Sequence, residues 1–174
     1  MTLLRTEGLR VHFGGVRALD GVDLSIEAGG IVGLIGPNGA GKTTFIDAVS
    51  GMVPLTGGTV SFNGQDVTQE PPFERANRGL IRTFQTLELY EDLIVEQNLA
   101  AGAEPTQWWQ FLVDAFRPGR SAVANARVAD VHDVVGLANV RVRMPTEHSH
   151  GPRRLVSLAR ALAAQPNLLL RNEP

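Results

Sequence analysis

Gly36-Pro37-Asn38-Gly39-Ala40-Gly41-Lys42-Thr43 is the stretch of sequence that decides the fold of this chain. It matches the pattern G-x-x-x-x-G-K-[ST]. Its glycines let the backbone turn so that successive N–H groups point inward around phosphate oxygens. A helix that begins near Lys42 directs the positive end of its dipole at the same place. Lys42 adds a full charge near the β- and γ-phosphates, and the Thr43 hydroxyl can ligate Mg²⁺. The stretch therefore predicts a loop that binds the phosphates of ATP together with magnesium.

The segments that flank the loop have the patterns of a strand and a helix. Residues 31–35 are an apolar run without alternation, which is typical of a strand covered on both faces. After the loop, Phe45, Ile46 and Val49 form a helical apolar stripe, and Gly51 is well placed to end the helix. A glycine turn that binds nothing is the alternative, but this context favours a phosphate loop.

The lysine content singles out the same loop. The chain holds fifteen arginines and one lysine, Lys42. Lysine presents a compact, flexible point charge that an arginine fork does not reproduce at a crowded phosphate. The sole lysine therefore stands where a phosphate loop requires one.

Alternating patterns before and after the first helix predict strands. Two of them precede the loop and suit an antiparallel sheet with one face in water. After the helix, residues 59–62 are a predicted strand bounded by turns, of which Asn63-Gly64 is a strong hairpin signal. The apolar residues of the first two strands are Leu9, Val11 and Phe13, then Val22, Leu24 and Ile26.

The second half of the chain is mainly helical in pattern. Residues 93–136 look helical with a break near Pro118-Gly119, and another helix is predicted over residues 151–165. Leu168-Leu169-Leu170 begins a second buried strand. This order of elements predicts an α/β nucleotide-binding domain with two appended subdomains. The predicted apolar stripes of the helices are Val128, Val131 and Val135, then Leu155, Leu158 and Leu162.

The composition argues against several classes of protein. Sixteen basic and eighteen acidic residues give a net charge of −2, whereas nucleic-acid binding normally needs a basic excess. Arg75, Arg78 and Arg82 on one face of a predicted helix more often mark a solvated surface than a nucleic-acid stripe. The chain has no cysteine for disulfides or thiolate metal sites. No apolar run approaches the ~20 residues that cross a bilayer. Charged residues within the first seven positions disfavour a signal peptide. We expect a cytoplasmic protein that binds no nucleic acid.

Further motifs resemble those of one family. The sequence of the loop is typical of ABC-type ATPases. Arg82-Thr83-Phe84-Gln85 resembles their Q-loop, and His148-Ser149-His150-Gly151 resembles their signature motif. Residues 168–174 resemble the Walker B strand. The motifs occur in family order, and the wording of the Q-loop is most similar to the ATP-binding subunits of branched-chain amino acid importers, with urea-type importers close.

The resemblance implies a fold and a domain organisation. It implies an α/β, RecA-like P-loop NTPase core with an antiparallel β subdomain and a helical signature subdomain, truncated after the Walker B strand. Residues 1–174 would form a single ABC-type ATP-binding domain, incomplete at its C-terminus, with the helical subdomain at roughly residues 86–160.

The resemblance also assigns roles to residues that match family motifs. Glu173 would polarise the attacking water as general base, Gln85 would touch the metal or that water, and Lys42 completes the catalytic set. Thr43 and Gln85 are the implied magnesium ligands. The implied ATP contacts are Phe13, Gly36, Pro37, Asn38, Gly39, Ala40, Gly41, Lys42, Thr43, Thr44, and, for a nucleotide held by a second subunit, Ser149 and Gly151.

Three of these residues have simpler explanations. Phe13 would stack on adenine, but it is nearly as well explained as a core residue of the first strand. Gln85 could be a loop glutamine with no ligand. Ser149 could be an ordinary helix N-cap.

Several positions depart from the family pattern. Asn172 replaces the Walker B aspartate and loses the negative charge that holds hydrated Mg²⁺. Arg171 replaces an apolar strand residue, where a buried, unpaired guanidinium is costly. His148 and Pro152 replace residues of the signature, although Pro152 is tolerable in the first turn of a helix. The chain ends at Pro174, before the family's D-loop and switch histidine, so we expect weak nucleotide binding and poor or absent hydrolysis.

The function that the resemblance implies is that of the ATP-binding subunit of an importer for branched-chain amino acids or similar small solutes. It would form a homo- or heterodimer with a second ABC ATPase subunit. It would also dock, near residues 84–95, on transmembrane permease subunits at the inner face of the cell membrane.

Other classes of function are weighed against this one. A nucleotide-binding module without hydrolysis is the main alternative, and Asn172 favours it. A soluble ABC ATPase of DNA repair or translation is disfavoured because no coiled-coil insertion or paired ATPase halves are visible. A GTPase would carry an Asn-Lys-x-Asp motif, which the position of the sole lysine rules out.

Overall fold

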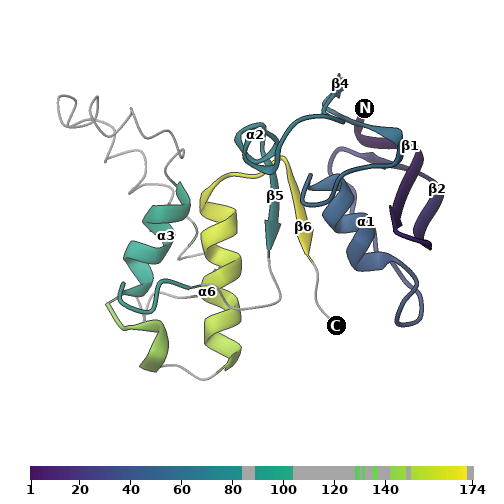
Figure 1. Ribbon diagram of the computed structural model, residues 1–174. Helices are drawn as coiled ribbons and strands as arrows, with labels where there is room; N and C mark the ends of the chain where they lie inside the picture. Colours follow the sequence, from purple (N-terminus) through teal and green to yellow (C-terminus); the bar gives the residue numbers. More distant parts are fainter. Residues whose placement is uncertain are drawn as a thin grey trace. The chain divides into compact units, whose positions relative to one another are not determined.

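A computed structural model of the chain describes residues 1–83, 89–103, 128–129, 131, 135–136, 142–147 and 150–171 (Figure 1). The chain divides into two compact units, Met1–Leu80 and Ile81–Pro174. The first unit carries the antiparallel sheet and the predicted phosphate loop. The second unit carries the helical part and a pair of strands.

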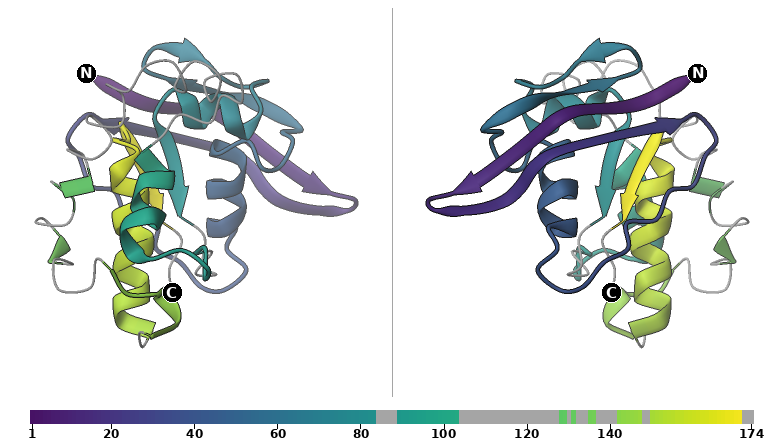
Figure 2. Two further views of the ribbon diagram at one scale, coloured as in Figure 1. Left: turned by 90° about the vertical axis from the view of Figure 1, so that its left-hand side faces the viewer. Right: turned by 90° about the vertical axis from the view of Figure 1, so that its right-hand side faces the viewer.

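An antiparallel sheet of four strands forms the frame of the first unit, in the order β2-β1-β3-β4. Figure 2 shows β1 and β2 running side by side along most of their length. One face of the sheet is buried, with Leu4, Leu9, Val11, Val60 and Phe62 nearly inaccessible to solvent. The alternation in the sequence therefore predicted this sheet correctly. The strands span Thr2–Phe13 (β1), Val16–Glu27 (β2), Gly57–Phe62 (β3) and Gln65–Asp66 (β4).

Phe13 does not share the buried face of β1, contrary to the prediction from its spacing. Its side chain is 51% exposed, whereas Leu9 and Val11 are buried. The pairing of β1 with β2 shifts register between Val11 and His12. A register irregularity interrupts the alternation of side chains between the two faces. The ring of Phe13 therefore points away from the core.

Helix α1 (Lys42–Val49) follows the loop and buries Phe45, Ile46 and Val49, as the sequence predicted. Gly51, with φ of +78°, ends it in a Schellman arrangement. The N–H of Gly51 donates to the carbonyl of Ala48 at 3.2 Å, and the next N–H donates to that of Asp47 at 2.8 Å.

The prediction of a buried strand over residues 31–35 is wrong for this structure. The segment has no strand assignment and joins neither of the sheets formed by the described residues. The side chains of Ile31 and Ile35 are fully exposed, and those of Val32 and Leu34 are partly exposed. An apolar run without alternation becomes a buried strand only within a sheet whose two faces are covered, and none of the described strands pairs with this run.

The three arginines predicted on one helix face have three different environments. Helix α2 (Pro72–Asn77) holds Arg75, which is buried, and ends before Arg78, which forms an ion pair with Glu70 at 2.6 Å. Arg82 belongs to strand β5 (Leu80–Thr83) instead. The prediction of a solvated arginine face is therefore wrong, because the helix is shorter than the pattern suggested.

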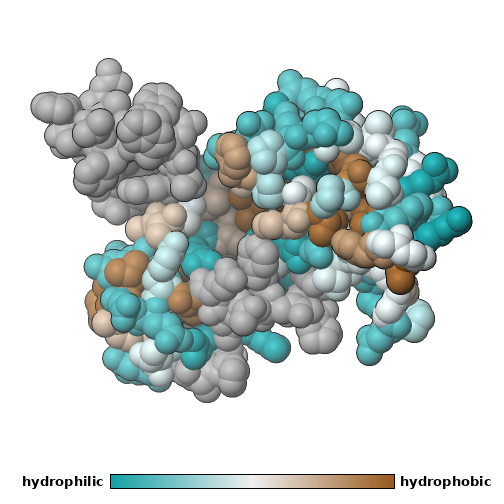
Figure 3. All heavy atoms as spheres, viewed as in Figure 1, coloured by the Kyte–Doolittle hydropathy of each residue, from teal (hydrophilic) through white to brown (hydrophobic). Residues whose placement is uncertain are grey.

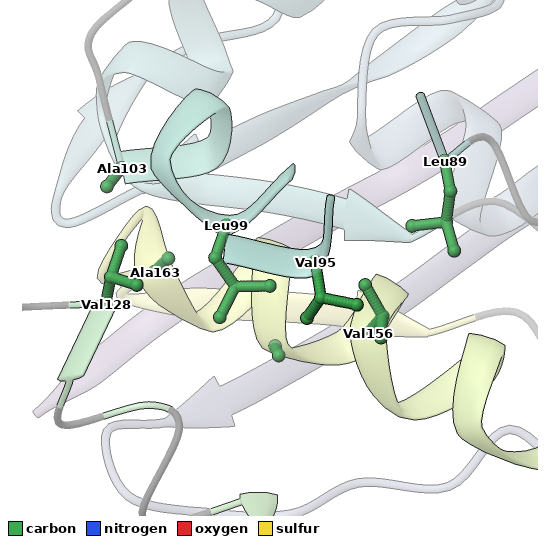
Figure 4. Close-up of a cluster of buried hydrophobic side chains, with 8 residues drawn as sticks. Leu89, Val95, Leu99, Ala103, Val128, Val156 and Ala163 are labelled. Carbon is green, nitrogen blue, oxygen red and sulfur yellow. The ribbon is translucent and has the colours of Figure 1, made fainter. Parts of the chain in front are cut away.

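In the second unit, helix α3 (Val95–Ala103) packs against helix α6 (His150–Ala163). Figure 4 shows Val95 and Leu99 of α3 facing Val156 and Ala163 of α6. Residues at the predicted positions Val128, Val131 and Val135 also pack in this cluster, as expected from their spacing.

The predicted stripe of α6 is displaced by one position. Val156, Ala159 and Ala163 are fully buried, whereas Leu155 is 43% exposed and Leu158 and Leu162 are only partly buried. The reason is the close approach of the two helices. A Cβ on Gly102 would collide with the backbone carbonyl of Arg160, and such proximity favours small side chains at the contact.

The remaining elements of the second unit are short. Strand β6 (Leu168–Arg171) pairs with β5, and a 3₁₀ turn spans Pro145–Glu147. Leu170 is buried, while Arg171 is exposed, so the cost expected for a buried guanidinium does not arise. Pro152 lies in the first turn of α6, where a proline is tolerated. The predicted break near Pro118-Gly119 lies outside the described residues.

The described surface mixes hydrophilic areas with apolar patches, as Figure 3 shows for one face. Among the described residues, no helix is both long enough and apolar enough to cross a bilayer.

Candidate phosphate-binding site

The loop between residues 36 and 41 is shaped by glycines in the left-handed region. Gly39 and Gly41 both have φ of +83°, which costs an L-residue roughly 1–2 kcal/mol. The N–H of Ala40 donates to the carbonyl of Pro37 at 3.2 Å and closes a tight turn. A Cβ on Gly41 would lie 2.6 Å from the carbonyl oxygen of Ala18 in β2. Both the dihedral angle and the contact with β2 therefore require glycine at position 41.

Lys42 bends back over the loop that precedes it. Its ammonium group donates to the carbonyl oxygens of Gly36 at 2.6 Å and Pro37 at 2.7 Å. An ammonium has three N–H donors, so this arrangement fixes the charge and leaves donor capacity for an oxygen of a bound anion. The loop and the lysine thus form one preassembled group.

The N-terminus of α1 supplies the second attraction for an anion. Gly41 makes no side-chain cap, and the first turn holds no acidic residue. The first N–H groups of a helix are not used by the helix's own hydrogen-bond ladder. Together with the helix dipole they favour a negatively charged ligand.

The donor set fits the phosphates of a nucleotide. The loop approaches β2 closely at Gly41, and Thr43, which follows Lys42, is exposed. Among the described residues, no cluster of acidic or histidine side chains could hold a metal. A magnesium ion here would depend on the Thr43 hydroxyl and on the phosphate oxygens of the nucleotide itself.

Phe13 is available for contact with a planar group. Because its ring is half exposed, the alternative of a core residue is excluded. An exposed aromatic ring at the end of β1 is suited to stacking on a base. Val16, its partner across the hairpin, is 66% exposed.

The other predicted site residues are not assembled with the loop by the described structure. Gln85, Ser149 and Glu173 lie outside the described residues, as does Asn172. Gly151 is exposed in the first turn of α6. The described site is therefore the loop with the N-terminus of α1.

Sequence reasoning missed Arg75, whose guanidinium lies at the opposite end of α1 from the loop. It donates to the carbonyl oxygens of Ala48 and Val49, the last residues of that helix. The spacing of Arg75 and Arg78 looks the same whether the side chains are solvated or buried, so the sequence held no signal for this contact.

Comparison with known proteins places these features in a wider group. The family model described as "ABC transporter" matches residues 19–174. The chain is 30% identical over 188 residues to the probable branched-chain amino acid transport ATP-binding protein LivG of Methanocaldococcus jannaschii, an alignment that covers 100% of this chain and 68% of that protein. It is 36% identical over 168 residues to the putative 2-aminoethylphosphonate import ATP-binding protein PhnT of Salmonella typhimurium, covering 97% of this chain and 42% of that one.

A solved structure shares the fold. The crystal structure of a nucleotide-free ATP-binding cassette from an ABC transporter superposes with a TM-score of 0.82 at 31% identity, over 100% of this chain and 70% of that chain. The predicted α/β P-loop fold is thereby confirmed.

Proposed function

Because the chain belongs to the ABC transporter family, we propose that it is the ATP-binding subunit of an importer, in which binding and hydrolysis of ATP drive the uptake of a small solute. Residues 1–174 are then one ATP-binding domain with its helical subdomain at roughly residues 86–160. The observation that carries the proposal is the Lys42 ammonium held over the loop carbonyls at the N-terminus of α1.

The chemistry of the site follows from this group. The loop amides and Lys42 bind the β- and γ-phosphates, and Phe13 stacks on adenine. Thr43 and Gln85 would hold magnesium, which would supply positive charge beside the phosphates. Glu173 accepts a proton from the attacking water, and Ser149 and Gly151 contact the γ-phosphate of a nucleotide bound by the partner in a head-to-tail dimer.

Calorimetric titration with Mg·ATP tests the binding step. The wild-type chain is expected to release or absorb heat in a saturable manner, and Lys42→Ala is expected to abolish it. Arg5→Ala is the matched control. It also removes one positive charge, but Arg5 is an exposed cation that pairs with Glu7. Heat that survives Lys42→Ala, or that Arg5→Ala removes equally, would contradict the proposal.

The partners and the location are proposed from the family. Importers of this family combine ATP-binding subunits with permeases, so we place the chain at the inner face of the cell membrane, docked through residues 84–95. The solute is proposed to be a branched-chain amino acid, since the Arg82-Thr83-Phe84-Gln85 wording and one relative point there. Another relative is named for 2-aminoethylphosphonate, so transport assays with the cognate permease should offer both solutes.

A second candidate function is nucleotide binding without hydrolysis. Asn172 carries it, because an amide at the Walker B position lacks the charge that retains hydrated magnesium. ATP turnover by the wild-type chain, Asn172→Asp and Lys42→Ala distinguishes the two functions. Turnover that appears only in Asn172→Asp supports the binding module, whereas Lys42-dependent turnover in the wild-type chain supports the ATPase.

A further inference from the structure

The guanidinium of Arg75 is buried among backbone carbonyls. The residue is 2% exposed, although arginine is rarely buried without a partner. Its Nε donates to the carbonyl of Glu70 at 2.9 Å, and Nη2 donates to that of Thr68 at 2.9 Å. Its Nη1 donates to two further carbonyls, of Ala48 at 3.1 Å and Val49 at 2.7 Å. The side chain thus ties the segment before α2 to the end of α1.

The two carbonyls bound by Nη1 belong to the C-terminus of α1. Carbonyls in the last turn of a helix lack intrahelical partners, and that end carries a partial negative charge. The last turn of α1 has no basic residue of its own. Arg75 therefore supplies, from another element, the cation that this helix end lacks.

The charge of Arg75 is maintained in this position. Burial lowers the pKa of Arg75, while the carboxylates of Glu70 and Asp66 raise it. Arginine stays protonated in proteins because its ordinary pKa lies far above neutrality. Glu70 is itself fixed by Arg78, whose Nε and Nη2 donate to the two carboxylate oxygens at 2.7 and 2.6 Å.

Gly51 makes room for this contact. It has φ of +78°, and a Cβ there would lie 3.0 Å from the Nε of Arg75 and 3.2 Å from the carbonyl oxygen of Glu70. The same glycine ends α1 through its N–H bond to Ala48. The end of the helix and the guanidinium therefore occupy a fitted position that a side chain at 51 would disturb.

We propose that Arg75 is a positioning residue for the phosphate loop, because it anchors the far end of the helix whose N-terminus carries Lys42. The inference rests on the proposed function of that loop in nucleotide binding. Helix α1 has eight residues and is about 12 Å long, so a tilt or shift at its C-terminus is transmitted to its first turn. Loss of the anchor moves the amides and the ammonium out of register with the phosphates.

The test compares four variants of the full chain by Mg·ATP titration. The temperature is one at which circular dichroism shows that each variant is folded. Arg75→Met removes the donors and keeps the length of the stem. Arg75→Lys restores a cation with three donors. Arg78→Met removes a neighbouring arginine that pairs with a carboxylate instead of α1. Val60→Ala creates a cavity in the core of the sheet without removing a hydrogen bond of Arg75, and it controls for general loss of stability.

The expected result is a Kd raised about tenfold in Arg75→Met, which corresponds to about 1.4 kcal/mol, with most of the affinity recovered in Arg75→Lys. Arg78→Met and Val60→Ala are expected to stay within about twofold of the wild-type chain. The inference is overturned if the Kd of Arg75→Met equals the wild-type value. It is also overturned if Val60→Ala raises the Kd as much as Arg75→Met does.

A spectroscopic measurement without nucleotide separates this inference from the proposed function. In ¹H–¹⁵N spectra, Arg75→Met is expected to shift the amide signals of Gly39 and Gly41, whereas Arg78→Met leaves them in place. Unchanged loop signals in Arg75→Met overturn the positioning role. Absence of any Lys42-dependent nucleotide binding in the wild-type chain overturns the proposed function even where these loop signals do shift.

Discussion

At the scale of single residues, the geometry of Lys42 asks for a lysine and not merely for a cation. Its ammonium meets two carbonyl oxygens of the loop within 2.7 Å. A guanidinium is planar and broader, and it presents its donors in a rigid fork. We predict that Lys42→Arg raises the Kd for Mg·ATP about tenfold or more, although the charge is kept. Calorimetry measures this change, and an unchanged Kd would show that charge alone suffices.

Asp66 gives a prediction for the pH dependence of stability. Hydrogen bonds from the hydroxyl and the backbone N–H of Thr68 lower the pKa of the Asp66 carboxyl below its ordinary value. A carboxyl with a lowered pKa in the folded state contributes stability above its unfolded pKa, and that contribution is lost as the pH falls through the folded value. We predict that Asp66→Asn lowers the free energy of unfolding at pH 6 and that the difference shrinks below about pH 4. Urea unfolding at a series of pH values measures it; a difference that does not depend on pH contradicts the assignment.

The residues whose environment could be predicted are constrained by local geometry, whereas the others are constrained by contacts with distant parts of the chain. Gly39, Gly41 and Lys42 are constrained by local backbone geometry, which the order of residues records directly. Phe13 and Arg75 depend on a register shift and on a contact with a distant helix end. Such constraints are set by tertiary packing. The solvated environment predicted for Arg75 was therefore wrong, and for Phe13 the sequence left both a core position and a stacking role open.

At the scale of secondary-structure elements, the distance between helices decides which face is buried. The pattern of α6 offers leucines at one set of positions and small residues at the next. Hydrophobicity alone favours burial of the leucines. The close approach of the two helices at Gly102 instead buries the smaller residues Val156, Ala159 and Ala163. The existence and extent of the helix were predictable from its period. Its rotation depends on the partner helix, which the sequence of α6 does not describe.

The contact between α3 and α6 gives a prediction in which two effects oppose each other. Alanine exceeds glycine in helix propensity by about 1 kcal/mol, so Gly102→Ala would stabilise an uncrowded helix. Here the new methyl group meets the backbone of Arg160, which cannot rotate away as a side chain can. Overpacking costs about 1–3 kcal/mol, and we predict net destabilisation.

Gly151→Ala is the matched control for Gly102→Ala. Gly151 also lies in a helix, but no atom lies within 4 Å of the position of a new Cβ. Thermal unfolding is expected to show a lower midpoint for Gly102→Ala and an equal or higher midpoint for Gly151→Ala. Equal effects of the two substitutions would mean that helix propensity, and not packing, governs the contact.

At the scale of the whole molecule, the pairing of strands that are distant in sequence is the least predictable feature. The hairpin of β1 with β2 follows from local alternation and turn residues. The run at residues 31–35 carries the composition of a central strand, yet none of the described strands pairs with it. Composition records that a segment can be covered, whereas the identity of the cover depends on other segments.

This exposed run leads to a prediction about self-association. An exposed segment with the composition of a buried strand favours pairing with another chain, and Ile31 and Ile35 are fully exposed. We predict that the wild-type chain associates in a concentration-dependent manner in sedimentation velocity and that Ile31→Lys reduces this association. Val16→Lys is the control, because Val16 is an exposed apolar residue outside the run, and both substitutions make the net charge of −2 less negative by one unit. If Val16→Lys reduces association as much as Ile31→Lys, charge accounts for the effect.

Because Ile31 lies five residues before the loop, its substitution should leave the Lys42-dependent binding of Mg·ATP intact. This result would separate the self-association of the run from nucleotide binding by the loop that follows it.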